Sequence, residues 1–585
     1  MAPPTTLRPA WNLRRADPGA VAALERDGLP RLSATLLALR GHRDPREVKA
    51  HLSARPMDLH DPSLLPGMEA GTERVARAIA DGETILVHGD YDVDGVTGTS
   101  LLMRLFDLLG ARAEWHIPNR LVDGYSFGPH SIERAEATGA GVVISVDNGT
   151  SAHSVIGELR ERGIDTVVTD HHEAPPGPLP AATAIINPKL PDSTYPWREL
   201  CGGAVAFKFA WGLAQRLRAE NRPVPDLKAF LEEATAYVAI ATVSDVVPLL
   251  SENRVFARFG LKALAGSSSP GLRAMLKVAG LSGRPLTAED VAFQIGPRIN
   301  ASGRLGSAQK AVELLLAKDD ERALELAREL DELNQERRRI EREVLAEARV
   351  AAGDYADADE HPVLFLAGEG WHQGVVGIVA ARLTEEFGRP AIVVGLEGDS
   401  GRGSARTVGR FSVLEALSGA APVCARFGGH EQAAGLEIEA AAVDEARRLV
   451  NDRAREMLAG GSYPAPELTI DLELPFEEMT PDAMRQLDLL APFGEGNEKP
   501  VLRSSEVFLA RPPRAVGADG SHLMLELRRG NHVLKAMAFG EGRRLDELAM
   551  GKPLDVVYSP TWNTFRGETK LELVLADFRP AASTS

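Results

Sequence analysis

The segment that decides the fold of this chain is TILVHGDYDVDGVTG, residues 84–98. It opens with an apolar run rich in β-branched residues, which predicts a buried strand. An apolar helical pattern begins soon after, near Leu101. The turn between them therefore lies at the carboxyl end of a strand, where parallel α/β sheets build their sites. The polar side chains of this segment are His88, Asp90, Asp92 and Asp94.

These closely spaced carboxylates favour a metal site. Three carboxylates so near in sequence repel one another unless a cation neutralises them, and oxygen ligands suit Mg²⁺, Mn²⁺ or Ca²⁺. An EF-hand loop is one alternative, because residues 90–95 fit its first half. Its twelfth position, however, is Leu101 rather than Glu, and a strand precedes it where an EF-hand has a helix. A solvated acidic turn is the other alternative.

Later strands end in similar residues. Strand candidates over 84–87, 142–146, 166–169 and 184–186 alternate with helical patterns such as 131–138 and 151–162. This alternation predicts a parallel sheet, so the carboxyl ends of the strands share one edge. An Asp after one strand is usually a turn residue, but polar clusters after three strands indicate a metal centre. The residues that follow the second and third strands are Asp147, Asp170, His171 and His172.

Four further regions follow the first sheet. An apolar helix over 232–242 leads to Asp245, which is either a cap or a ligand, and residues 290–307 are expected to form a Gly-rich loop with Arg298 and Arg304. Residues 320–352 have the apolar stripe of one long helix that bridges two domains. A second α/β unit over 361–458 contains a loop leading into a helix at 370–377 and Gly-rich loops at 401–406 and 428–435. None of these matches a nucleotide-binding fingerprint.

The last part of the chain predicts a small β-barrel. Short strand candidates occur at 468–472, 501–502, 523–527, 533–539, 555–559 and 570–575, with turn residues between them. The OB-fold is a good candidate, because it is a five-stranded barrel and commonly binds nucleic acid. The residues expected to supply charge and stacking there are Arg528, Arg529, Lys535, Trp562, Phe565 and Arg566.

Bulk properties agree with a multidomain globular protein. The chain has 585 residues, two cysteines and a net charge of -17, and this charge argues only mildly against a nucleic-acid partner. Apolar runs of membrane-spanning length are absent from the sequence, and the N-terminus lacks the apolar core of a signal peptide. We therefore expect a cytoplasmic protein, with residues 1 to about 70 packed as an extension on the first domain.

Together these motifs resemble the DHH phosphoesterase superfamily, and within it the RecJ family of single-strand-specific 5′→3′ exonucleases. The resemblance covers residues 70 to 580 and rests on the segments at 88–95, 145–149, 170–172, 245, 296–304, 370–377, 403–406, 428–435 and 492–497, and on Ile117-Pro-Asn119-Arg120. It implies an α/β fold with five parts. These are an N-terminal extension (1–70), a DHH domain with a parallel sheet (71–308), a connecting helix (309–355), a second, DHH-associated α/β domain (356–460) and an OB-like barrel that binds nucleic acid (461–585).

The resemblance also implies a metal-dependent phosphodiesterase. Two divalent cations are expected, with Mn²⁺ preferred because of the histidine ligand and Mg²⁺ also suitable. The expected ligands are His88, Asp92, Asp94, Asp147, His171 and Asp245. His172 is expected to face the scissile phosphate and Asp90 and Asp170 to support the ligands. The expected catalytic set is His172, Asp90, Arg298 and Asn300.

A pocket for a terminal 5′-phosphate would give the reaction its polarity, because arginine and hydroxyl donors can read that extra charge. The expected substrate-binding residues are Arg120, Arg304, Ser404, Arg406, Gly428, His430, Trp371 and His372. The implied substrate is single-stranded DNA, preferably 5′-phosphorylated, cut to 5′ mononucleotides during DNA repair and recombination. A helicase and a single-strand-binding protein are the candidate partners, with no membrane. Two alternatives stay open: a DHH phosphodiesterase for short oligonucleotides or cyclic dinucleotides, and a non-catalytic single-strand binder.

Overall fold

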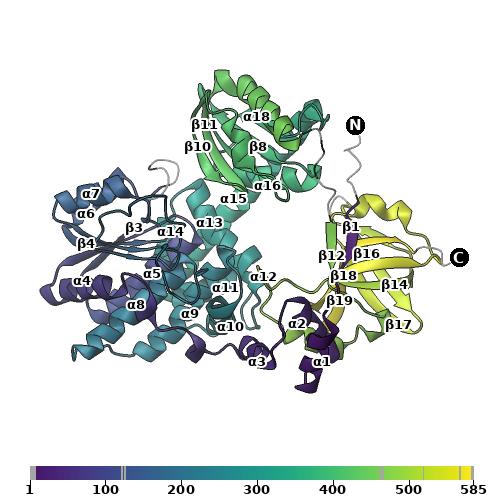
Figure 1. Cartoon of the computed structure of the whole chain (residues 1–585), viewed down its shortest axis with the longest axis horizontal. Helices are drawn as coiled ribbons and strands as arrows, with labels where there is room; N and C mark the ends of the chain where they lie inside the picture. Colours follow the sequence, from purple (N-terminus) through teal and green to yellow (C-terminus); the bar gives the residue numbers. More distant parts are fainter. Residues whose placement is uncertain are drawn as a thin grey trace.

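The computed structural model describes residues 8–119, 123, 127–459, 461, 463, 467–517, 520–565 and 568–581. Two α/β domains and a β-rich domain follow one another in this part of the chain, and a long helix joins the first two (Figure 1). The fold class predicted from the sequence is confirmed. Within the described ranges, none of the helices has the length and apolar character that a membrane crossing needs.

The first domain is built on a parallel sheet with the strand order β3-β2-β4-β5-β6. Alternate residues of its strands enter two cores, one beneath α4, α5 and α8 and the other beneath α6 and α7, because helices cover both faces. The four predicted strands are present, and β3 adds one that the sequence pattern did not reveal. The strands are β2 (Thr84–Gly89), β3 (Ala113–His116), β4 (Ala140–Val146), β5 (Asp165–Thr169) and β6 (Ala184–Ile186).

Helices complete this domain, and one of them replaces a predicted loop. Residues 290–307 are almost entirely helical, so the expectation of a Gly-rich loop is wrong. Their glycines allow close packing instead: a Cβ on Gly303 would lie 2.6 Å from the Tyr91 carbonyl oxygen. The helices are α4 (Met68–Asp81), α5 (Val93–Leu109), α6 (Pro129–Thr138), α7 (His153–Glu161), α8 (Gly202–Ala219), α9 (Leu227–Ser244), α10 (Ser251–Ala265), α11 (Pro270–Val278), α12 (Ala288–Asp290), α13 (Gly296–Leu305) and α14 (Gln309–Leu316).

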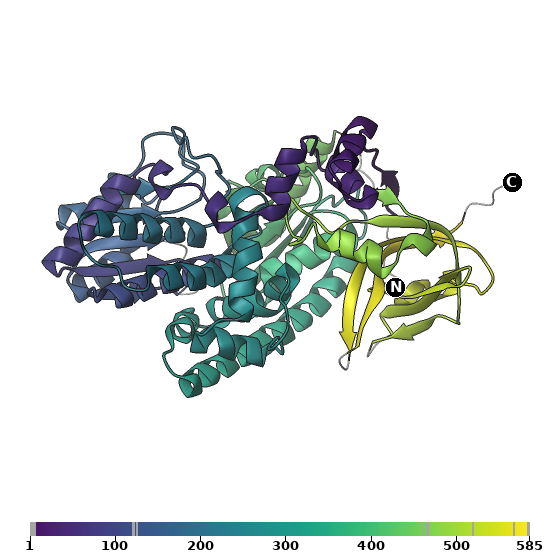
Figure 2. The same cartoon turned by 90° about the horizontal axis from the view of Figure 1, so that it is seen from below.

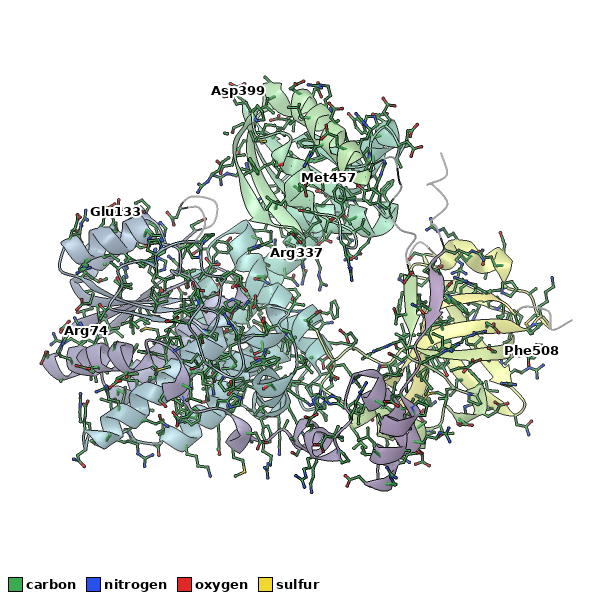
Figure 3. All side chains as sticks on the ribbon, viewed as in Figure 1. Arg74, Glu133, Arg337, Asp399, Met457 and Phe508 are labelled. Atoms are coloured by element: carbon green, nitrogen blue, oxygen red, sulfur yellow. The ribbon has the colours of Figure 1, made fainter. Side chains whose placement is uncertain are left out.

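The long helix α15 (Asp320–Ala352) has the predicted limits and bridges two cores. Leu326 and Leu330 belong to the core of the first domain, whereas Val344 and Ala348 belong to a core of the second. Between them lies Arg337, labelled in Figure 3, whose guanidinium donates to Glu341 and Asn334 of the same helix. The charged middle of α15 is therefore stabilised by its own ion pairs.

The second domain has a mixed sheet with the order β10-β11-β9-β8-β7. The Gly-rich segments at 401–406 and 428–435 belong to its strands, so their assignment as loops is wrong. Glycine at 403 lets the Leu436 side chain pack closely against β9, because an added Cβ would lie 2.5 Å from Leu436 Cδ2. The elements are β7 (Leu364–Glu369), α16 (Val376–Phe387), β8 (Ala391–Glu397), β9 (Ser400–Arg406), α17 (Val413–Ser418), β10 (Cys424–His430), β11 (Ala433–Glu439) and α18 (Val443–Leu458).

The C-terminal domain is the predicted OB-like sheet. Its strand order is β13-β14-β18-β19-β17-β16-β15, and β14 also pairs with β16, which curls the sheet towards a barrel. The elements are β12 (Glu467–Ile470), β13 (Leu472–Glu473), α19 (Pro481–Asp488), β14 (Leu502–Leu509), β15 (Arg514–Val516), β16 (His522–Arg529), β17 (His532–Ala538), β18 (Leu554–Phe565) and β19 (Glu568–Pro580).

Most of the N-terminal segment packs on this last domain rather than on the first, whereas Leu59, Leu65 and Met68 pack on the first domain as expected. Strand β1 (Ala10–Leu13) pairs in parallel with β12. The helices α1 (Pro18–Arg26), α2 (Arg31–Leu39) and α3 (Pro45–Ser53) share a core with the barrel, and their ribbons lie on the barrel's side of the molecule in Figures 1 and 2. The apolar patterns of these helices are short and do not indicate which domain they pack against, so the sequence could not predict this arrangement.

Candidate metal centre and phosphate pocket

The carboxyl ends of β2, β4 and β5 bring the predicted acids together. Groups of these side chains offer ligand atoms that all lie within 4.8 Å of one another. This convergence follows from the parallel sheet, because neighbouring strands end at the same edge. The groups are Asp90, Asp92 and Asp147; Asp94, His171 and Asp245; and Asp147, His171 and His172.

Two helix N-termini fix the first pair of acids. Asp92 caps α5, and its Oδ1 accepts hydrogen bonds from the N–H groups of Asp94 and Gly95 at 2.9 and 3.2 Å. Asp94 is 1% exposed, and its two carboxylate oxygens each accept a 2.6 Å bond from Gly202 and Gly203 at the start of α8. The positive end of the α8 dipole thus faces the Asp94 carboxylate.

Asp147 lies at the centre of the cluster. Its backbone is left-handed, with φ of 64°, which an Asp tolerates better than most residues. An added Cβ on Gly202 would lie 2.6 Å from Asp147 Cβ, so glycine at 202 lets α8 approach. The glycine pair at 202–203 is the main site feature that sequence reasoning missed, and its signal was two glycines opening an apolar helix.

His171 connects three of the acids. Its Nε2 lies 3.1 Å from Asp147 Oδ1 and 3.7 Å from Oδ2 of both Asp94 and Asp245. Asp245 follows the last residue of α9 and its N–H donates to Ala241 within that helix. The carboxylate that the sequence left as either a cap or a ligand is therefore part of the cluster.

The electrostatics of the cluster call for a cation. Burial, followed by the charge of Asp92, raises the pKa of Asp94 to about 7. Burial and the charge of Asp94 raise the pKa of Asp245 to about 8, and the same causes raise the pKa of Asp147 well above its ordinary value. Asp147 Oδ1 is buried and makes no hydrogen bond among the described residues. An oxygen-rich set with one imidazole fits Mn²⁺ or Mg²⁺.

His172 forms a different pair beside the cluster. Asp170 is 1% exposed, and its Oδ1 lies 2.8 Å from His172 Nδ1 while its Oδ2 accepts from the Thr150 N–H at 2.9 Å. Burial alone would lower the pKa of His172, but the Asp170 hydrogen bond and charge outweigh it and raise the pKa to about 9. In the metal-free protein His172 is thus an imidazolium at neutral pH, and its side chain is 43% exposed.

His88 does not belong to any of the acid groups. Its imidazole is fully buried and lies instead with His116 and His130, at ring-centroid distances of 5.1 and 5.7 Å. The sequence could not predict that the His88 side chain points away from the acids, because His88 lies near the end of β2 and the acids follow directly in the next turn.

The two expected residues of α13 have other surroundings. Arg298 is 8% exposed, and its Nε donates to Asp331 Oδ1 of α15 at 2.9 Å, so it joins two helices. Asn300 lines a pocket of about 560 Å³ together with Ser244, Phe293 and Phe493. Neither residue is among the groups of acids.

The second domain collects a set of anion-binding groups. Arg406 donates to the Ser404 hydroxyl at 2.8 Å. An added Cβ on Gly377, in the first turn of α16, would lie 3.0 Å from Ser404 Oγ and 3.2 Å from an Arg406 nitrogen, so a helix N-terminus adjoins both. Strand register aligns Gly428 with Ser404 and His430 with Arg406 across β11. Ser404 and Arg406 are therefore in contact with each other, with Gly377 beside them, whereas Gly428 and His430 lie two strands away in the same rows of the sheet.

The remaining expected residues lie at the domain junction or outside the described chain. Arg304 donates to the Gly374 carbonyl at 3.2 Å, which joins α13 to the second domain. His372 Nδ1 accepts from the Gly374 N–H at 3.0 Å. Trp371 is 6% exposed and donates to Glu347 of α15 at 2.7 Å, so it is a core anchor. Arg120 lies outside the described residues.

Several of the barrel residues expected to bind nucleic acid instead contact other side chains of the same domain. Lys535 pairs with Glu572 at 3.1 Å and Trp562 donates to Asp488 at 2.8 Å. Arg528 lies over the ring of Phe508, 5.9 Å from its centroid, and Arg529 lies 3.5 Å from Glu477. Arg566 and the side chain of Phe565 are outside the described residues.

Comparisons with known proteins agree with this geometry. Residues 84–241 match the DHH family N-terminal domain, residues 360–456 the DHHA1 domain and residues 470–577 the RecJ OB domain. The single-stranded-DNA-specific exonuclease RecJ of Escherichia coli is 34% identical over 97% of this chain and 99% of its own length. RecJ of Bacillus subtilis is 34% identical over 97% of this chain and 70% of its own length.

A solved structure is similar over nearly the whole chain. The crystal structure of Thermus thermophilus RecJ in complex with Mn²⁺ has a TM-score of 0.80 at 31% identity, covering 98% of this chain and 80% of that one. The same protein in complex with Mg²⁺ has a TM-score of 0.74 at 30% identity, covering 98% and 79%. This chain belongs to the RecJ family of DHH-domain proteins.

Proposed function

We propose that this protein is a single-stranded-DNA-specific exonuclease that hydrolyses phosphodiester bonds from the 5′ end and releases 5′ mononucleotides. The observation that carries the proposal is the buried acid cluster around Asp147, beside a charged His172. Membership of the RecJ family supports the substrate class, because its named relatives are exonucleases specific for single-stranded DNA.

The proposed ligands of two divalent cations are Asp92, Asp94, Asp147, His171 and Asp245. His88 is left out of this set, because its imidazole lies with two other histidines. Mn²⁺ is the preferred ion and Mg²⁺ the alternative, since one ligand is an imidazole and the others are carboxylates. When bound, such a pair activates water and stabilises the leaving oxygen of an in-line displacement. Asp147 is the proposed bridging ligand because its Oδ1 faces His171 and it belongs to two of the groups.

His172 is proposed to contact the scissile phosphate. Its charge and partial exposure suit a donor to a phosphate oxygen. Asp170 holds the ring through Nδ1, which leaves Nε2 for the substrate. Asp90 is proposed as a supporting residue of the metal centre, because it groups with Asp92 and Asp147. Arg298 is proposed to position α13 rather than to act on the substrate, because it is held by Asp331.

The 5′ polarity is proposed to come from the second domain. Ser404, Arg406 and the N-terminus of α16 form a set that suits a terminal phosphate, because backbone N–H groups and a guanidinium both bind that anion. His430 and Gly428 extend the same rows of the sheet. Arg304 and His372 both bond to Gly374 at the junction of the two domains and are proposed to contact the strand there. Arg120 is proposed to complete the phosphate-binding set.

The wider role follows from this chemistry. An enzyme that shortens one strand needs a partner to supply single strands, so a helicase and a single-strand-binding protein are the proposed partners in DNA repair and recombination. The barrel is proposed to guide the strand beyond the cleavage site.

Substrate class is tested by digesting four substrates in Mn²⁺: long single-stranded DNA, blunt duplex DNA, a DNA dinucleotide and a cyclic dinucleotide. The proposal requires the long single strand to be degraded at least as fast as the dinucleotide and the duplex to survive. Exclusive cleavage of the dinucleotide or the cyclic dinucleotide would instead identify a small-substrate phosphodiesterase.

A further inference from the structure

We infer that His88, His116 and His130 form a second metal site, separate from the acid cluster, that takes Zn²⁺ or a similar borderline cation. One ring nitrogen from each histidine lies within 4.8 Å of those of the other two. The set contains no carboxylate, so it differs in chemistry from the centre around Asp147.

The fold places these three rings on one side of the sheet. His88 and His116 are direct neighbours on the parallel strands β2 and β3, so their side chains point to the same face. His130 is the second residue of α6, after Pro129. The His130 ring centroid lies 5.7 Å from that of His88 and 5.5 Å from that of His116. Three separate elements thus converge on one point.

Each ring keeps a nitrogen available for a ligand bond. The buried atoms His88 Nδ1, His116 Nε2 and His130 Nε2 have no hydrogen-bond partner among the described residues. His88 itself is fully buried. A buried polar atom normally finds a hydrogen-bond partner. Three buried nitrogens without a partner, one in each ring of the same histidine cluster, are better explained by a shared cation than by three separate unsatisfied atoms.

The other nitrogen of His88 is already oriented. Its Nε2 lies 2.8 Å from Ser131 Oγ, and that oxygen also accepts from the Gly128 N–H at 3.1 Å. When Nε2–H donates to Ser131, the lone pair of Nδ1 is free. Metal-binding histidines usually donate their second N–H in this way, because the bond fixes the ring and its tautomer.

The ligand type selects the ion. Neutral imidazoles suit Zn²⁺ better than Mg²⁺ or Mn²⁺, which prefer oxygen. Three protein ligands leave one position of a tetrahedral ion for water. Such an ion would tie β2 and β3 to the start of α6, and would therefore stabilise the positions of the two elements that flank residues 117–128. The alternative is a metal-free stack in which the rings pack against Phe127, whose centroid lies 4.8 Å from that of His88.

The test uses the full chain in which the acid cluster has been disabled by Asp147→Asn and Asp245→Asn. After chelation and reloading with Zn²⁺, we expect one tightly bound Zn²⁺ per chain by elemental analysis. X-ray absorption at the zinc edge should show three imidazole ligands. The acid cluster offers only His171 and His172, so a count of two or fewer would overturn the inference.

A ligand variant and a matched control complete the experiment. Adding His130→Gln, at a half-buried position, should remove the Zn²⁺, whereas His153→Gln, at an exposed histidine on α7, should retain it. Zn²⁺ should raise the melting temperature of the control but not of the His130→Gln chain, while both melt alike in chelator. Retention of the Zn²⁺ by His130→Gln would overturn the inference. If the chain with His130→Gln does not fold, the number of imidazole ligands in the chain that keeps His130 still tests the inference.

Discussion

The Nε2 atom of His171 lies 3.1 Å from Oδ1 of Asp147, although the two residues follow different strands of the first sheet. The contact exists because β4 and β5 are parallel neighbours that end in register. Around it, two further carboxylates lie 3.7 Å from the same imidazole nitrogen. The metal-free protein therefore holds closely spaced carboxyl groups in a buried place, where burial and their mutual repulsion raise their pKa values. This makes its stability depend on pH.

The stability of the metal-free protein should fall as pH rises from about 4 to 8. The pKa of Asp245 is raised to about 8 by burial and by Asp94, so its stabilising contribution is complete below the pKa of the unfolded chain and is lost as pH rises through the folded value. We expect Asp245→Asn to remove part of this slope. Melting temperatures in chelator at pH 5, 6.5 and 8 measure it, with Asp192→Asn, at an exposed position, as the control. Identical slopes for the two variants would contradict the prediction.

The Asp170–His172 pair should control the alkaline side of the activity profile. Asp170 raises the pKa of His172 to about 9, so Asp170→Asn should return it towards 6.5. The rate in Mn²⁺ should then fall about 10- to 100-fold, and more at pH 8 than at pH 6, because the imidazolium is lost as pH rises. An equal loss at both pH values would contradict this prediction, and would mean that Asp170 acts only through the hydrogen bonds that it accepts from the backbone N–H groups of residues 150, 171 and 172.

The predictable part of the structure was the part governed by strand and helix periodicity. Asp92, Asp94 and Asp147 were found because parallel strands end at one edge, and α15 because its apolar stripe is long. Glycine misled at Gly303 and Gly403, where it permits close packing inside a helix and a strand instead of marking a loop. The direction of His88 and the bond of Arg298 to Asp331 depend on elements distant in sequence, so no local pattern revealed them.

Arg406 should matter only for substrates with a 5′-phosphate. A charge-assisted hydrogen bond contributes about 1.5–3 kcal/mol, so Arg406→Ala should raise KM for 5′-phosphorylated single-stranded DNA about 10- to 150-fold. The same variant should leave KM for 5′-hydroxyl DNA nearly unchanged. Arg402→Ala is the control, because Arg402 lies four residues away on β9 and pairs with Glu437 at 3.2 Å. Equal effects on the two substrates would remove Arg406 from the phosphate pocket.

Arg298 should act through stability. Its bond to Asp331 joins α13 to α15, so Arg298→Ala should reduce the free energy of unfolding by about 1–3 kcal/mol. In a double-mutant cycle with Asp331→Ala, denaturant unfolding should give a coupling energy of at least about 0.5 kcal/mol. Zero coupling together with a lost turnover rate would restore the catalytic role that the sequence suggested.

The most direct test of the account is digestion of long 5′-phosphorylated single-stranded DNA labelled at either end, by the native chain and by Asp147→Asn in Mn²⁺. We predict early release of the 5′ label as a mononucleotide, late release of the 3′ label, and a rate for Asp147→Asn lower by more than about 100-fold with DNA binding retained. Earlier release of the 3′ label, or undiminished cleavage by Asp147→Asn, would contradict it.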